Sequence, residues 1–476
     1  MNKSDNGRKL IVGTGIYAVG TFGTKILMFL IVPLYTHYLS TAELGTYDVL
    51  ISTISLLTPI VSMQISDAAY RWIIRENVES SIYLRITYQF LLVSSLIALV
   101  IILIVTWFIE IPYLSYFLGG LFSAMFFNIS QKILRGLKRQ WLFAMSGLLY
   151  TCVFLAMNVI QLCVFHRGVE SLLMSYISAN LIGIVAIFVL EKRLRVDIFG
   201  YVDIKRINEL LSFSLPLIPN YLSWWVVDSS ARYIVLAFLS ISANGILAVA
   251  VKFPTVLQSV FGIFLNSWQD LAIANEKTEK DFFSIVFRRL YRFSFILLWI
   301  VVPVTKICVW FVMGEDYKIA CDYIPFYYLG AVFQIFCSFY GVSYLRAKNT
   351  TGAFYTSIYA AIINAIVNIA LISFIGLYAV GIAAFLAYLV MWLIREKHNR
   401  NELGISIQWL EFWGMLSLDI LLCVVSIMGS LKVNIILLFI GMICFILCGW
   451  NTIKIVCDKE NIYVQNKYDS DKVHKV

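Results

Sequence analysis

The sequence has little charge. Only 14% of its 476 residues are Asp, Glu, Lys or Arg, while 61% are hydrophobic. Soluble domains carry about 25% charged residues, and a soluble chain of this length needs polar residues to cover several domains. The shortage excludes a soluble protein, so most of the molecular surface must face lipid.

Signals of metal, redox and hydrolytic chemistry are also scarce. The chain has four histidines and nine cysteines, and no two cysteines form a Cys-x-x-Cys pair. Most cysteines lie inside apolar runs, where they act as small apolar residues. No His/Cys/Asp group has metal-ligand spacing, no Ser/His/Asp order stands out, and no stretch resembles a Walker A loop. We therefore expect neither an enzyme nor a metal site nor a bound cofactor.

Long apolar runs set the fold class. Single runs exceed the roughly 20 residues that a helix needs to cross a membrane. They are continuously apolar, which excludes the alternating strands of a transmembrane β-barrel. Hydropathy predicts an all-α polytopic membrane protein with about 14 transmembrane helices. The spans that matter below are expected at 10–37, 43–69, 112–133, 209–238, 243–271, 409–429 and 432–456.

The placement of basic residues predicts the topology. If the N-terminus lies in the cytoplasm and each span crosses, 30 of the 37 Lys and Arg residues fall on the cytoplasmic side. Only Arg167, Lys318 and Lys432 fall outside. An excess of Lys and Arg marks cytoplasmic loops, so we expect an even number of spans with both termini cytoplasmic. The net charge of +9 then reflects topology and does not indicate nucleic-acid binding.

The chain contains an internal repeat. Leu39-Ser40 with Gly45 recurs as Leu239-Ser240 with Gly245, and Leu134-Arg135-Gly136 is echoed by Leu345-Arg346-Ala347. Both halves start on the same side, which predicts a parallel repeat with its axis along the membrane normal. The expected parts are a six-helix lobe at 1–190, a cytoplasmic connector at 191–208, a six-helix lobe at 209–396, two additional helices at 397–456 and a polar cytoplasmic tail at 457–476.

Three stretches resemble a known family. They are Tyr38-Leu39-Ser40…Glu43-x-Gly45-x-Tyr47, then Ser214-Leu215-Pro216-Leu217-Ile218-Pro219 followed by Asp228 and Arg232-Tyr233, and lastly Gly376-Leu377-Tyr378-Ala379-Val380-Gly381-Ile382-Ala383-Ala384. Their order, with the span count and the repeat, is similar to the polysaccharide flippases of Wzx type, for O-antigen or capsule repeat units. Those belong to the multidrug/oligosaccharidyl-lipid/polysaccharide exporter superfamily. The resemblance implies two lobes around a V-shaped central cavity.

The same resemblance implies an activity. Such proteins turn undecaprenyl-pyrophosphate-linked oligosaccharide from the cytoplasmic to the outer leaflet of the bacterial inner membrane, and they do not hydrolyse ATP. The implied partners are the lipid-linked oligosaccharide, membrane lipids and other membrane proteins of polysaccharide assembly.

Ionised side chains deep in the membrane are costly and normally face a wet cavity or a partner. Lys25 lies near the middle of the first span, Lys252 lies in the eighth, and Asp228 and Arg232 share one face of the seventh. We expect these residues to line the cavity, where the surplus of basic groups would balance a pyrophosphate. Structural alternatives stay open: the lysines paired with carboxylates, and Asp228 with Arg232 as an intrahelical ion pair.

Weaker candidates are other charged and aromatic residues. Four charged residues are candidates for gate pairs or for binding a coupling proton or sodium ion: Asp48, Asp67, Arg71 and Asp270. Partners of buried bases and ordinary interfacial charges look the same in sequence. Trp224 and Trp225 are candidates for stacking on sugars, but interfacial aromatic belts are more common. Pro216 and Pro219 should kink or interrupt the seventh helix.

Other functions compete with the flippase. A multidrug exporter of the same superfamily usually carries cations, which the basic excess disfavours. A lipid II flippase needs the same basic groups, so this function remains an alternative. A membrane polysaccharide polymerase or ligase would place catalytic groups on a sizeable outside loop, whereas the outside loops expected here are short.

Overall fold

The computed structural model describes residues 24, 27, 29–75, 80–197, 199–274, 280–346 and 350–447. Within them every regular element is a helix, and twelve helices are long and apolar enough to cross a membrane. These twelve correspond to the second to thirteenth expected spans. The first and last expected spans, 10–37 and 432–456, extend into residues outside the described ranges. The all-α polytopic fold is confirmed.

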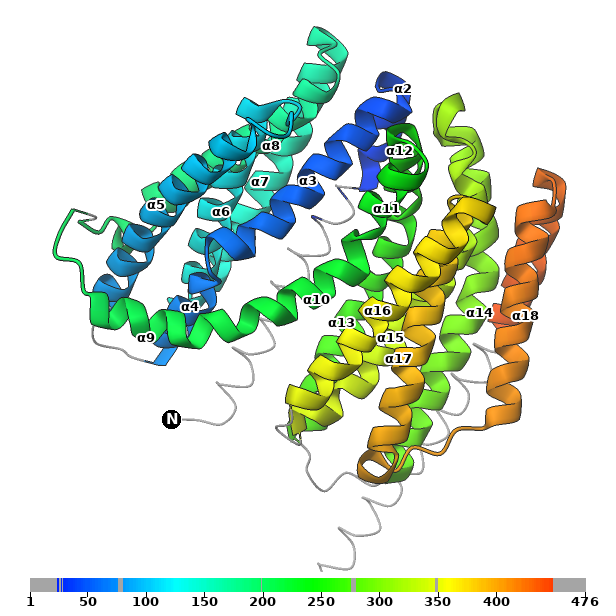
Figure 1. Cartoon of the computed structure of the whole chain (residues 1–476). Helices are drawn as coiled ribbons and strands as arrows, with labels where there is room; N and C mark the ends of the chain where they lie inside the picture. Colours follow the sequence, from blue (N-terminus) through cyan, green and yellow to red (C-terminus); the bar gives the residue numbers. More distant parts are fainter. Residues whose placement is uncertain are drawn as a thin grey trace, which may run out of the picture.

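The helices form two lobes, which Figure 1 shows meeting at one end and diverging towards the other. Lobe one contains α2 (Val32–Tyr38), α3 (Thr41–Val61), α4 (Ile65–Arg75), α5 (Ser80–Val105), α6 (Leu114–Gly136), α7 (Gln140–Ile160) and α8 (Val169–Leu190). Residues 191–203 connect it to lobe two. We call the end that carries this connection the connector end, and the opposite end, where α2 leads into α3, the turn end.

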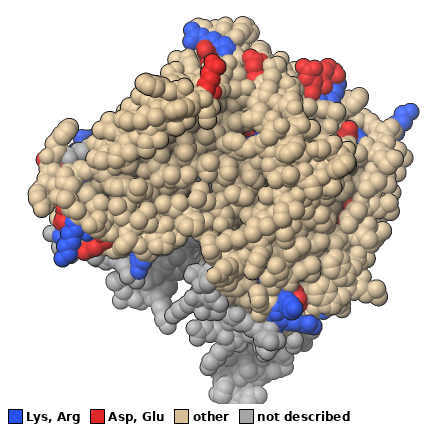
Figure 2. All heavy atoms as spheres, in the orientation of Figure 1, with Lys and Arg blue, Asp and Glu red and all other residues tan. Residues whose placement is uncertain are grey.

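Helix α9 (Ile204–Ser214) follows the connector and packs against α4 and α5 of lobe one. Lobe two contains α10 (Ile218–Ser229), α11 (Ala231–Phe238), α12 (Ile241–Ala250), α13 (Lys252–Ala274), α14 (Lys280–Val312), α15 (Ala320–Arg346), α16 (Thr350–Ile375) and α17 (Tyr378–Leu403). Outside it, against α14, lies α18 (Trp409–Met428), followed by the helix Leu431–Leu447. On the face in Figure 2, charged side chains gather near the two ends and leave an uncharged belt between them, as a membrane-spanning surface requires.

The repeated motif starts an equivalent helix in each lobe. The Ser40 hydroxyl accepts a hydrogen bond from the Glu43 backbone N–H at 3.3 Å, and the Glu43 carboxylate accepts from the Ser40 N–H at 2.9 Å. This capping box begins α3. In lobe two the Ser240 hydroxyl accepts from the Ala243 N–H at 3.1 Å and begins α12. The sequence repeat is therefore also a structural repeat.

Two expected spans are broken inside the membrane. The seventh span, expected over 209–238 with a kink or interruption at its prolines, forms α9, a 3₁₀ turn at Leu215–Leu217, then α10 and α11. The turn lies at Pro216, as the proline pattern predicted. The second span, expected to run continuously over 43–69, divides into α3 and α4 at residues 62–64. Met63 and Gln64 there adopt left-handed backbone conformations, with φ of 46° and 51°.

Aromatic packing fixes α18 to lobe two. Phe412 of α18 is fully buried and stacks on Trp392 of α17, with ring centroids 4.8 Å apart and an interplanar angle of 21°. Phe333 and Phe336 of α15 complete this core. Buried aromatic pairs contribute about 0.5–1.5 kcal/mol each beyond their burial, so α18 is an integral part of lobe two.

Candidate functional site

A cavity of about 850 Å³ lies between the two lobes. Lobe one contributes residues of α3, α4, α6, α7 and α8, and lobe two contributes residues of α10 and α13. Much of the polar lining is uncharged, from hydroxyl and amide side chains and from the tyrosines Tyr35, Tyr47, Tyr150 and Tyr176. The volume falls within the roughly 300–1,000 Å³ of ligand sites.

All charged residues in the described lining are basic. They are Lys132 and Arg135 of α6 and Lys252 of α13. Lys132 forms an ion pair with Asp67, whose Oδ1 lies 2.7 Å from Nζ. Asp67 itself is not among the lining residues, so the described wall presents positive charge to the cavity.

Arg135 marks the opening of the cavity towards the connector end. It is exposed and lies in the last turn of α6, where a cation also complements the helix dipole. Its guanidinium lies over the rings of Tyr70 and Phe143, 5.5 and 5.7 Å from their centroids. These cation–π contacts orient the charge at the wall.

Lys252 lies on the lobe-two wall, as expected. It is the first residue of α13, directly after the turn at Val251 that ends α12. Its exposed side chain borders the cavity. The other predicted cavity lysine, Lys25, lies outside the described residues.

Backbone contacts close the turn end between the lobes. Gly45 of α3 lies against the backbone of Ile241 and Gly245, and Gly245 of α12 lies against that of Thr41. Nearby, the Thr36 hydroxyl accepts a hydrogen bond of 3.1 Å from the Gly314 N–H. These contacts, between lobe one and lobe two, form what we call the turn-end seal.

Tyr317, in the turn Glu315–Tyr317 that precedes α15, strengthens the seal. Its hydroxyl donates hydrogen bonds to the Ser40 carbonyl oxygen at 2.8 Å and to the Leu39 carbonyl oxygen at 3.2 Å. Burial, with the nearby Glu43 carboxylate, raises the pKa of Tyr317 above its usual value. The phenol therefore keeps its proton and remains a donor.

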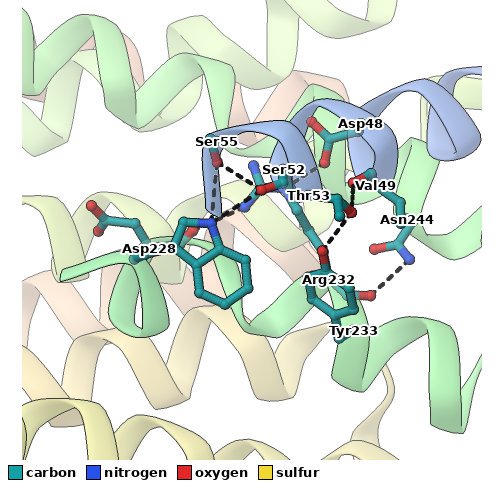
Figure 3. Close-up of polar contacts among 10 residues, drawn as sticks. Asp48, Val49, Ser52, Thr53, Ser55, Asp228, Arg232, Tyr233 and Asn244 are labelled. Carbon is teal, nitrogen blue, oxygen red and sulfur yellow. Dashed lines mark hydrogen bonds and ion pairs between the residues drawn. The ribbon is translucent and has the colours of Figure 1, made fainter. Parts of the chain in front are cut away.

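Asp48 and Arg232 join the lobes below this seal (Figure 3). Arg232 Nε donates to Asp48 Oδ2 at 2.5 Å, and both side chains are largely buried. Asn244 donates to the Arg232 carbonyl oxygen at 2.8 Å, and the hydroxyls of Thr53 and Tyr233 share a hydrogen bond of 2.6 Å. Asp48 is therefore the partner of a buried base from the other lobe.

The structure does not contain the intrahelical ion pair between Asp228 and Arg232 that was one alternative for these two residues. Arg232 Nη1 donates to the backbone carbonyl oxygen of Asp228 at 2.9 Å, while the Asp228 carboxylate accepts from the Tyr388 hydroxyl at 3.0 Å. The long Arg232 side chain extends to the Asp48 carboxylate of the other lobe and not to the Asp228 carboxylate, which lies one helical turn away. Neither Asp228 nor Arg232 is among the described cavity-lining residues.

The structure also places the candidate gate residues. Asp67 lies in the first turn of α4 and accepts a hydrogen bond of 3.3 Å from Tyr221 of α10, besides its pair with Lys132. Arg71 lies over the ring of Phe213 of α9, 4.3 Å from its centroid. Asp67 therefore contacts α10 of lobe two, whereas Arg71 contacts α9, which packs on lobe one. Asp270 is in α13, and its side chain lies outside the described part of the chain.

Trp225 joins two helices. Its Nε1 donates to the Ser52 carbonyl oxygen at 3.2 Å and to the Ser55 hydroxyl at 3.1 Å, which ties α10 to α3 (Figure 3). Trp224 packs against the apolar core of lobe two. Neither indole is among the described cavity-lining residues.

Sequence reasoning missed Lys132 and Arg135 as cavity residues. The sequence assigns the basic segment 132–139 to a cytoplasmic loop at the end of the expected fourth span, whereas α6 continues to Gly136. The repeated stretch Leu134-Arg135-Gly136 was the signal in the sequence that could have drawn attention to Arg135. In the described ranges no three His, Cys, Asp or Glu residues are grouped to hold a metal ion.

The fold and the cavity together define a two-lobed, all-α membrane-spanning protein built on a parallel repeat. Solved structures with this fold include "Lipid II flippase MurJ, inward closed conformation", with a TM-score of 0.68 and 16% identity over 90% of this chain and 97% of that one. An inward-facing multidrug resistance MATE family transporter of the MOP superfamily has a TM-score of 0.63 and 13% identity over 81% and 99%. A MOP superfamily transporter from Pyrococcus furiosus has a TM-score of 0.53 and 12% identity over 83% and 96%.

The sequence pattern of one family covers more than half of the chain. It is that of the polysaccharide biosynthesis proteins, and it matches residues 10–269. The chain belongs to the polysaccharide biosynthesis protein family. A search of curated proteins finds no match.

Proposed function

We propose that this protein flips undecaprenyl-pyrophosphate-linked oligosaccharide repeat units, as flippases of Wzx type do, from the cytoplasmic to the outer leaflet of a bacterial inner membrane. The observation that carries the proposal is the basic charge of the cavity wall, at Lys132, Arg135 and Lys252. Positive groups that border the cavity attract an anionic headgroup by direct Coulomb interaction. Family membership and fold support the same function.

The cavity also suits a glycan. Sugars present apolar faces that pack on aromatic rings and hydroxyls that need hydrogen-bond partners. Tyr150 and Tyr176 supply rings, while Ser55, Thr58 and Asn128 supply hydroxyl and amide groups on the same wall. The headgroup would occupy this polar space while its polyprenyl chain stays in the bilayer.

Charge placement orients the protein. The connector end carries most of the basic residues of the predicted cytoplasmic side, so we assign it to the cytoplasm. The cavity reaches that end at Arg135, and the turn-end seal closes the other end. The structure then represents an inward-facing state. Transport by alternating access requires the seal to separate while the lobes close at the connector end.

The alternatives differ in headgroup and charge. A lipid II flippase needs the same pyrophosphate contacts and differs in the glycan. A multidrug exporter of cations would meet repulsion from Lys132, Arg135 and Lys252. If this protein moved cationic drugs but no pyrophosphate lipids, it would be assigned the exporter function.

Flipping in proteoliposomes tests the proposal. Wild-type protein should move a fluorescent undecaprenyl-pyrophosphate oligosaccharide faster than lipid II, and the reverse order would assign the lipid II function. Lys252→Gln should slow flipping about tenfold, the loss expected for one charged hydrogen bond, and Lys252→Arg should retain most of the rate. Lys318→Gln, which changes a lysine paired with Glu315 outside the cavity, is the matched control.

A further inference from the structure

The break in the second span lies on the cavity wall. Residues 62–64 separate α3 from α4, and the cavity lining includes Ser62, Gln64 and Ser66. Met63 and Gln64 hold φ angles of 46° and 51°, which are uncommon for residues other than glycine. Breaks of this kind inside a membrane are tolerated where the chain lines a polar cavity.

Three polar side chains at the break border the cavity, and each belongs to a residue that is more than nine-tenths buried. Ser62 is 4% exposed, Gln64 is 6% exposed and Ser66 is 5% exposed. None of their side chains forms a hydrogen bond with any residue that the structure describes, although all three border the cavity. The oxygen and nitrogen atoms of these side chains nevertheless stay accessible from the cavity, where a polar ligand can bond to them. Their available partner is whatever fills the cavity.

The electrostatic setting favours an anion. Helix α4 is 11 residues long and begins directly after Gln64, so its N-terminal partial positive charge lies at the break. Helix α6 packs against α4 and adds Lys132 and Arg135 to the same cavity wall. The carboxylate in the first turn of α4, Asp67, is already paired with Lys132.

We propose that residues 62–66, together with Lys132 and Arg135, bind the pyrophosphate of the lipid-linked cargo at the cytoplasmic entrance of the cavity. The Gln64 amide and the Ser62 and Ser66 hydroxyls donate hydrogen bonds to the phosphate oxygens, and α6 supplies the positive charge. The cargo then meets two basic positions in turn, this one near the connector end and Lys252 on the opposite wall. This inference rests on the proposed function.

Binding of farnesyl pyrophosphate to the purified full-length protein in detergent tests the proposal, because this probe carries the pyrophosphate without any sugar. Gln64→Gly removes the amide and accepts the left-handed conformation. It should weaken binding about tenfold, as should Ser62→Ala combined with Ser66→Ala. Met63→Gly is the matched control, since it changes the same backbone break at a side chain that is 38% exposed and does not border the cavity. Its affinity should equal that of the wild type.

Each contrary outcome has a distinct meaning. Unchanged affinity in Gln64→Gly and the serine variant, or an equal loss in Met63→Gly, overturns the site. Variants that lose affinity only for the lipid-linked oligosaccharide show that the break contacts sugar, which also overturns it. Inorganic pyrophosphate should bind more weakly than farnesyl pyrophosphate, and equal binding would identify a free-anion site instead. Failure of the wild type to flip any pyrophosphate lipid in proteoliposomes would reject the proposed function itself.

Discussion

Gly45 and Gly245, which occupy equivalent positions in the repeat, face each other across the two lobes. A Cβ atom added to Gly45 would overlap the carbonyl oxygen of Ile241, and one added to Gly245 would overlap that of Thr41. Only a residue without a side chain permits this approach. The starts of α3 and α12 thus close the turn end through their backbones, while both helices keep the same serine cap.

Gly45→Ala should therefore weaken the turn-end seal. The overlapping atoms belong to the backbone and cannot rotate away, so the strain should destabilise the closed end by about 1–3 kcal/mol. Spin labels on the turn-end tips of α5 and α14 should then report a larger share of long distances, and flipping should slow. Gly262→Ala, at a site with open space, should change neither. An unchanged distance distribution in Gly45→Ala would contradict the seal.

Asp48→Asn should lower the melting temperature markedly. It leaves the Arg232 guanidinium buried without its carboxylate, and breaking a buried ion pair from one side costs about 3–5 kcal/mol. The double variant Asp48→Asn with Arg232→Gln should be more stable than Asp48→Asn alone, because no unpaired charge remains. Arg232→Gln should give no such recovery to Asp228→Asn. If Arg232→Gln instead restored the melting temperature of Asp228→Asn, the ion pair would lie within the seventh span.

Asp67→Asn should tighten binding of farnesyl pyrophosphate about fivefold. The substitution removes the carboxylate that competes with the ligand for Lys132. Stability should change by less than about 1 kcal/mol, because both side chains are partly exposed. Lys132→Gln should weaken binding. Glu315→Gln, which removes an acid paired with Lys318 away from the cavity, serves as the control in the same titration.

Lys306→Met should loosen α18 from lobe two. Lys306 Nζ donates to the carbonyl oxygens of Ser426, Ile427 and Gly429 at 2.6, 3.0 and 3.2 Å, and lies 3.1 Å from Asp322 Oδ1. Methionine fills similar space but leaves these buried acceptors unpaired, which should cost about 3–5 kcal/mol. Thermal unfolding in detergent checks this loss. The flipping rate per folded molecule should stay at the wild-type value, and a large drop would link α18 to transport.

The fold was predictable because membrane crossing imposes a length and an apolar composition that hydropathy detects directly. Pro216 also signalled the interruption of the seventh span, since proline removes a helical hydrogen bond. The break at Met63 and Gln64 has no proline of its own, and α3 continues past Pro59 to Val61 before it ends. Neither residue is a helix breaker, so its conformation depends on packing between α3, α4 and α6 that a local pattern does not contain.

The site was less predictable than the fold. Helical spacing correctly put Asp228 and Arg232 on one face, but the partner of Arg232 is Asp48, 184 residues away and in the other lobe. Such a pair depends on how the lobes meet. Lys252 was found because a charge inside an apolar run is conspicuous, whereas Lys132 and Arg135 stand at the end of a run and look like ordinary loop residues.

The attachment of α18 makes it a reporter for the motion of lobe two. Its described contacts include α14, α15 and α17, all of which belong to that lobe, and its Ser426 also bonds to Asn434 of the helix that follows. A fluorophore at Leu410, which is 93% exposed, would travel with lobe two and stay clear of the cargo. Paired with a second dye on lobe one, it would let single-molecule fluorescence time each cycle of the carrier while the cavity remains unlabelled.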